Sequence, residues 1–164
     1  MLIRSLDPPD VVQLPVPPEL CVVVIRPNQR LRTADARAVL PADISRTVAL
    51  HQAAQVGAII AALACADYAL LGRAIDDRIA EPARARLLPG FLKAKAAALQ
   101  AGALGCSISG GGPSAFALVR GRAIGVEVAR AMTAAYQASG LSTDVRVAGI
   151  DRVGARLIEN GADG

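Results

Sequence analysis

The stretch GALGCSISGGGPSAFALV, residues 102–119, decides how the chain is organised. Three successive glycines and Pro113 separate two apolar runs, residues 103–109 and 114–120. Apolar runs of this length bounded by Gly and Pro are typical of strands, and the glycines between them are typical of a turn. The stretch therefore predicts two strands joined by a glycine loop.

Further elements are predicted on both sides of this pair of strands. Upstream, residues 1–6 followed by DPPD predict a short strand and a turn, and residues 20–27 predict a buried strand stopped by Pro27. Helical patterns lie between these strands and the glycine loop, at residues 34–40 with Thr33 as N-cap, from Asp43, from Asp67 to Pro82, and at 91–102. Downstream, we expect a helix at 123–140, a strand at 143–148, a turn at 151–154 and a strand at 155–159.

This element order predicts the fold class α+β, an antiparallel sheet with helices on one face. The best single topology is a ferredoxin-like plait with an inserted helical segment. At 164 residues the chain is of a length typical of one domain, residues 1–164. Such plaits carry many functions, so the fold alone does not decide what the chain does.

The composition limits both the core and the partners. Hydrophobic residues make up 53% of the chain but aromatic residues only 2%, so the core must be built from Ala, Val, Leu and Ile in closely packed helices. The net charge of +4 is not gathered into a basic stripe, which argues against a nucleic-acid partner. The longest apolar run, residues 56–66, is shorter than the roughly 20 residues that cross a membrane, so we expect no membrane association.

Cysteine and histidine usage excludes several kinds of site. The three cysteines are scattered without a C-x-x-C pair, and His51 is the only histidine. A disulfide framework and a zinc or histidine metal site are therefore not expected, and a reducing cytoplasmic compartment fits.

The glycine loop is the first candidate site. Glycine amides can approach a ligand closely, and the neighbouring serine hydroxyls could join them. The alternative is a loop that needs glycine only for its geometry. The pattern is neither of the common nucleotide-binding fingerprints, because a proline and a strand follow the glycines. The candidate residues are Ser107, Ser109, Gly110, Gly111, Gly112, Pro113 and Ser114.

Two further segments carry candidate binding side chains. Thr33 and Arg37 are four residues apart and share one face of the short predicted helix. Arg84 and Arg86 follow Pro82, which we expect to end a helix and leave both arginines on an irregular segment. Capping by Thr33 and ordinary solvated arginines remain the alternatives.

Taken together, these segments resemble the homoserine kinase family of the GHMP small-molecule kinases. RTADARAVLP is similar to that family's S-T-x-x-A-R-x-[IV]-L-P segment and EPARARLLPGF to its E-P-x-R-x-x-L-[IL]-P-G-F segment. GCSISGGGPSAFAL is similar to the third GHMP motif, and the tail DRVGARLIEN to the family's ending. These matches extend in order over residues 32–160.

The resemblance implies transfer of the ATP γ-phosphoryl group to the hydroxyl of L-homoserine, a step in threonine biosynthesis. It implies that Arg37 and Arg84 hold the substrate carboxylate, which suits guanidinium geometry. It also implies a catalytic role for Thr33, beside the hydroxyl that attacks, and a positioning role for the glycine loop, residues 107–114. ATP and Mg²⁺ are the implied cofactors, and a homodimer is compatible with the resemblance.

The sequence departs from the family in two respects. Gly111 stands where the family usually has Ser, which removes a hydroxyl from the loop. Nothing in the chain resembles the family's N-terminal P-x-x-x-G-L-G-S-S-A-A phosphate loop. We therefore expect a C-terminal, substrate-side domain without the ATP-binding domain, inactive by itself. A non-catalytic amino-acid-binding or dimerisation module and a different GHMP kinase are the alternatives.

Overall fold

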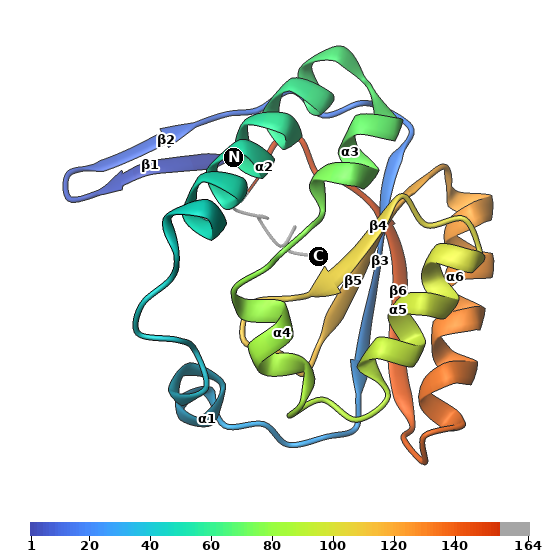
Figure 1. Cartoon of the computed structure of the whole chain (residues 1–164). Coiled ribbons are helices and arrows are strands. Elements are labelled where there is room, and N and C mark those ends of the chain that lie inside the picture. Colours follow the sequence, from blue (N-terminus) through green and yellow to red (C-terminus); the bar gives the residue numbers. More distant parts are fainter. Residues whose placement is uncertain (155–164) are drawn as a thin grey trace, which may run out of the picture.

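A computed structural model describes residues 1–154 of the chain (Figure 1). The predicted strand at residues 155–159 lies outside the described residues. The helices and strands follow in the order β1 (Leu2–Leu6), β2 (Pro9–Val12), β3 (Leu20–Pro27), α1 (Thr33–Ala38), α2 (Arg46–Cys65), α3 (Tyr68–Ala74), α4 (Ala80–Ala85), α5 (Phe91–Gln100), β4 (Gly105–Ile108), β5 (Ala115–Arg120), α6 (Arg122–Gln137) and β6 (Thr143–Gly149).

The centre of the fold is a four-stranded antiparallel sheet in the order β4-β5-β3-β6. Residues 102–119 do form the predicted hairpin, with Ile108 opposite Ala115 in the β4-β5 register. The sheet and its helices have the connectivity of a ferredoxin-like plait, and α1 to α4 are inserted between β3 and α5. The predicted α+β class is therefore confirmed. Strands β1 and β2 form a separate two-stranded hairpin that projects from the body (Figure 1).

Helices α5 and α6 cover one face of the sheet with small side chains between the layers. Ala94, Ala98 and Ala117 are fully buried there. A Cβ atom added at Gly125 of α6 would lie only 2.6 Å from the side chain of Val147 on β6, so the helix needs glycine at this point. The close packing expected from an alanine-rich, aromatic-poor core is confirmed.

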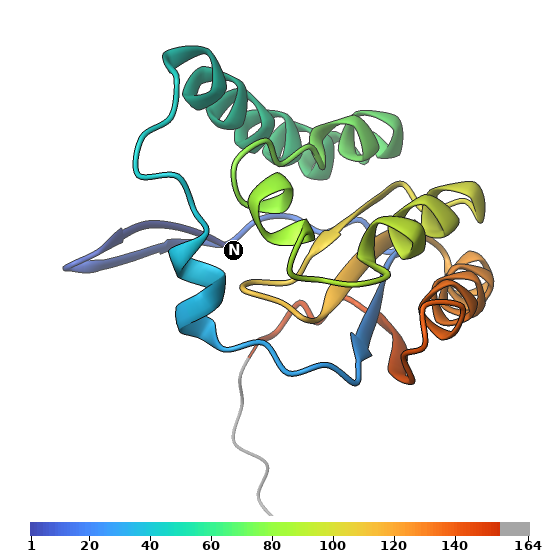
Figure 2. The ribbon, with the colours of Figure 1, turned by 60° about the horizontal axis from the view of Figure 1, so that its bottom comes forward.

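Helices α2 and α3 pack over one end of the opposite face. Leu20 of β3 and Leu118 of β5 point away from α5 and α6 and contact a second apolar cluster that includes Ala62 and Leu71. Figure 2 shows α2 and α3 standing apart from the α5-α6 layer. Strand alternation explains this arrangement, because successive residues of β3 and β5 face opposite sides of the sheet.

Helix α2 is mostly exposed. Of its twenty residues only Ala62 is buried, and Leu50 is 64% exposed. Within residues 1–154 it is also the one helix long and apolar enough to cross a membrane, with a mean hydropathy of 1.6. Length and composition alone do not place a helix in a membrane, so the expected absence of membrane association stays a prediction.

Several local predictions were wrong. The long helix expected from Asp43 begins at Arg46, with Ser45 as its N-cap. The helix that begins at Asp67 ends at Ala74 rather than at Pro82. Pro82 lies in the first turn of α4, where proline is tolerated because the first backbone N–H groups have no partner inside the helix. Arg84 is therefore helical. Arg32, not Thr33, occupies the N-cap position of α1, and no side chain caps that helix.

Candidate functional site

Arg84 brings the predicted segments together. It lies in the last turn of α4, and its Nε–H donates to the Ala36 carbonyl of α1 at 3.0 Å. Its Nη1 donates to the Gly110 carbonyl of the glycine loop at 2.8 Å. One guanidinium thus joins α4, α1 and the loop between β4 and β5. No other hydrogen bond of this guanidinium is found within residues 1–154, and its planar fork carries further donors that suit a carboxylate.

The glycine loop is tightly built. The Ser109 N–H donates to the Ser114 carbonyl at 2.8 Å, and the Gly112 N–H donates to the Ser109 carbonyl at 3.1 Å. Gly110 and Gly112 have φ values of +58° and +83°, which favour glycine, and the Gly112–Pro113 peptide bond is cis. The loop therefore needs glycine for its geometry. Its contact with a ligand stays a prediction.

Gly111 faces α1. A Cβ atom at this position would lie 3.7 Å from the Ala36 side chain, which is ordinary van der Waals contact. The loop therefore has room for the serine that the related motif usually carries. The glycine at this position removes a hydroxyl without being required by the backbone.

Thr33 and Arg37 stand on α1, and both side chains are exposed. Arg37 directly follows Ala36, whose carbonyl accepts the hydrogen bond from Arg84. The guanidinium of Arg84 is therefore hydrogen-bonded to the backbone of the residue that precedes Arg37. Arg86, the other arginine of the same segment, is exposed and lies just past α4.

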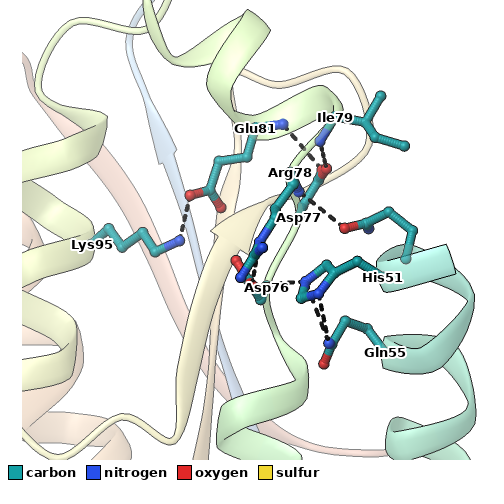
Figure 3. A network of polar contacts seen from close by, with 9 residues as sticks. His51, Gln55, Asp76, Asp77, Arg78, Ile79, Glu81 and Lys95 are labelled. Carbon is teal, nitrogen blue, oxygen red and sulfur yellow. Dashed lines mark hydrogen bonds and ion pairs between the residues drawn. The ribbon is translucent and has the colours of Figure 1, made fainter. Parts of the chain in front are cut away.

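Sequence reasoning missed a buried acidic residue beside this arrangement. Glu81 of α4 is only 9% exposed, and its Oε2 accepts a hydrogen bond from the Ser107 hydroxyl of β4 at 2.6 Å. Its Oε1 forms an ion pair with Lys95 of α5, drawn in Figure 3. Its place three residues before Arg84, on the same short helix, is the signal that could have revealed it.

A second polar network links α2 to the segment between α3 and α4 (Figure 3). His51 Nε2 lies 2.9 Å from Asp76 Oδ2, and the Arg78 Nε–H donates to the same oxygen at 3.0 Å. Burial opposes ionisation of this carboxyl, but the hydrogen bond and charge of Arg78, followed by those of His51, outweigh it and lower the pKa of Asp76. The single histidine thus has a structural partner.

The implied Mg²⁺ has no ready set of side-chain ligands among the described residues. Over residues 1–154 no group of three or more His, Cys, Asp or Glu side chains is placed to hold a metal ion. In the glycine loop the Gly112 N–H already donates a hydrogen bond to Ser109, and the Gly110 carbonyl already accepts one from Arg84.

Comparison with known proteins agrees with this arrangement. The family model described as "GHMP kinases C terminal" matches residues 58–138. The homoserine kinase of Chlorobium phaeovibrioides is 46% identical over 160 residues, which cover 96% of this chain and 50% of that protein. The homoserine kinase of Arabidopsis thaliana is 37% identical over 164 residues, which cover 98% of this chain and 44% of that protein.

Solved structures show the same relationship. The crystal structure of homoserine kinase from Cytophaga hutchinsonii superimposes with a TM-score of 0.90 at 45% identity, over 92% of this chain and 48% of that one. The mevalonate kinase of L. major shares the fold at a TM-score of 0.62 with only 14% identity. The chain spans about half the length of the curated relatives it matches.

The plait, its inserted helices and the family match define the class: the chain belongs to the GHMP kinase family and carries the C-terminal domain of that family. Within the family, the sequence corresponds to the C-terminal half of homoserine kinases.

Proposed function

We propose that the chain supplies the substrate-binding half of a homoserine kinase, the enzyme that transfers the γ-phosphoryl group of ATP to the side-chain hydroxyl of L-homoserine in threonine biosynthesis. One observation carries the proposal. Arg84 ties together α1 and the glycine loop, which are the two segments that the family resemblance places around the substrate. We propose that residues 1–164 act as this one domain, in the cytoplasm.

Arg84 and Arg37 are the proposed ligands of the homoserine carboxylate. The Arg84 side chain donates to the carbonyl of Ala36, so its guanidinium lies beside the part of α1 that carries Arg37. A carboxylate bound by two guanidinium groups leaves the rest of the amino acid in a defined orientation. The exposed Thr33, in the first turn of the same helix, is the proposed partner of the hydroxyl that attacks.

The glycine loop has a positioning role in this proposal. Phosphoryl transfer depends mainly on alignment of the attacking oxygen and on neutralisation of charge. Ser107, Ser109 and Ser114 frame the loop, and Arg84 fixes it against α1. We propose that ATP and Mg²⁺ are bound chiefly by the part of a homoserine kinase that this chain does not match.

Homoserine is favoured over the substrates of other GHMP kinases by the pattern of similarity. The relatives that share 37 to 46% identity with this chain are homoserine kinases, whereas the mevalonate kinase shares 14% and therefore supports the fold alone.

Titration calorimetry of the purified chain with L-homoserine tests the proposal. Arg84→Lys should weaken binding at least about tenfold, because lysine cannot give planar bidentate recognition. Arg130→Lys on α6, where the exposed arginine pairs with Glu127, is the matched control and should leave binding unchanged. If homoserine and threonine bind equally well, and Arg84→Lys changes neither affinity, a non-catalytic amino-acid-binding module is favoured instead.

A further inference from the structure

The most buried side chain of helix α4 is a charged one, although Ala85 of the same helix also packs against the apolar core. Of its six residues, only Glu81 is buried. A buried carboxylate is costly unless it is paired and hydrogen-bonded. Glu81 meets both conditions, through the ion pair with Lys95 and the hydrogen bond from Ser107. The position of α4 is therefore coupled to where Lys95 and Ser107 lie.

The two partners of Glu81 belong to the rigid part of the fold. Ser107 lies on β4 and is only 7% exposed. Lys95 lies on α5, between the fully buried Ala94 and Ala98, so its backbone is fixed against the sheet. Figure 3 shows the Glu81 side chain reaching from its short helix toward Lys95. One carboxylate thus anchors α4 to a strand and to a core helix.

The opposite end of α4 faces the candidate site. Arg84 follows Glu81 by three residues and donates to Ala36 and Gly110. Less than one helical turn therefore separates the anchored residue from the arginine that holds α1 and the glycine loop. A shift of α4 would displace this guanidinium and both carbonyl contacts together.

We propose that Glu81 is a positioning residue that, through Lys95 and Ser107, sets the geometry of Arg84 and of the glycine loop. Glu81 does not touch the substrate in this arrangement; it acts through Arg84. The inference rests on the proposed function only where it takes Arg84 as a contact of the substrate.

Hydrogen exchange measured by NMR on the full 164-residue chain tests the proposal without substrate. In Glu81→Gln the ion pair with Lys95 is lost, while the side chain keeps its shape. Exchange of the Arg84 Nε–H and of the Gly112 amide should accelerate at least about tenfold. The amides of Val23 and Ala117, in the two central strands, should keep their rates. Glu127→Gln removes an exposed carboxylate and should change none of these signals.

Two results would overturn the proposal. One is a folded Glu81→Gln chain whose Arg84 and Gly112 signals exchange as in the wild type. The other is equal acceleration at Val23 and Ala117, which would show general destabilisation instead of local positioning. If Glu81→Gln does not fold, Ser107→Ala and Lys95→Met are measured in the same way, and unchanged Arg84 exchange in both folded variants overturns the proposal equally.

An L-homoserine titration of the same samples separates this inference from the proposed function. Local acceleration in Glu81→Gln together with weaker homoserine binding supports both. Local acceleration in a chain whose wild type binds no homoserine keeps the positioning role of Glu81 and counts against the proposed function.

Discussion

At the residue scale, the glycine loop contains two glycines with different requirements. Gly112 has a φ of +83°, and a Cβ atom there would lie 3.3 Å from Leu88. Gly112→Ala should lower the free energy of unfolding by about 2 kcal/mol, because both the backbone and the neighbour are strained. Urea denaturation measures the loss.

Gly111→Ser is the matched variant one position earlier. Its Cβ atom would make only ordinary contact with Ala36, so its stability should stay within about 0.5 kcal/mol of the wild type. A loss as large as that of Gly112→Ala would show that the loop geometry is wrong.

The Cys106 thiol makes stability depend on alkaline pH. Burial raises the pKa of this thiol from 9.0 to about 12. The folded chain therefore keeps a proton that the unfolded chain loses above pH 9. The free energy of unfolding should fall between pH 9 and 12, by at most about 4 kcal/mol for this group.

Urea denaturation at several pH values from 8 to 11 measures this fall. Cys106→Ala should flatten it, whereas Cys65→Ala, which removes an exposed thiol, should not. Burial also raises the pKa of Tyr136 to about 12, so a smaller fall should remain in the Cys106 variant. Identical slopes in the wild type and in Cys106→Ala would contradict the prediction.

At the element scale, the N-terminus of α4 depends on Asp77. Its Oδ1 accepts hydrogen bonds from the backbone N–H groups of Ile79 and Ala80, both at 2.8 Å, and its Oδ2 accepts one from Glu81 at 3.1 Å. Asp77→Ala should cost about 1 to 2 kcal/mol, and exchange should accelerate first in α4. Asp67→Ala removes the cap of α3 and serves for comparison, since it should spare α4.

The elements that the sequence predicted best are those with strong local signals. The apolar run at residues 20–27 forms β3, and the glycine loop connects the β4-β5 hairpin as predicted. The helix predicted at 123–140 corresponds to α6. The prediction was wrong at Pro82, because proline both ends helices and occupies their first turns. Here Pro82 lies in a first turn because Asp77 caps the helix. The hydrogen bonds of this cap cannot be read from the spacing of residues in the sequence.

The candidate site was predictable as a set of segments but not as a constellation. Thr33, Arg37 and Arg84 could be singled out by residue type and by resemblance. The link from Arg84 to Ala36 and Gly110 could not, because it joins backbone carbonyls, which every residue carries. The buried Glu81 was missed for a related reason, since a glutamate on a short helix is usually exposed.

At the scale of the whole molecule, apolar side chains face solvent along α2. Leu50 is 64% exposed and Val56 is 47% exposed. Contiguous apolar surface favours self-association, so light scattering should show oligomers at high concentration of the purified chain. Leu50→Gln should shift the chain toward monomer, whereas Leu99→Gln on α5 should do so less. A clean monomer at every concentration would count against the prediction.

We infer that this chain forms the substrate-binding half of a homoserine kinase. The inference is tested by a fusion that joins the N-terminal half of the Chlorobium phaeovibrioides homoserine kinase to this chain, assayed for ATP-dependent phosphorylation of L-homoserine. We expect turnover by the fusion, a loss of at least about a hundredfold with Arg84→Lys, and negligible turnover by the 164-residue chain alone. A folded fusion without activity, or robust turnover by the chain alone, would contradict it.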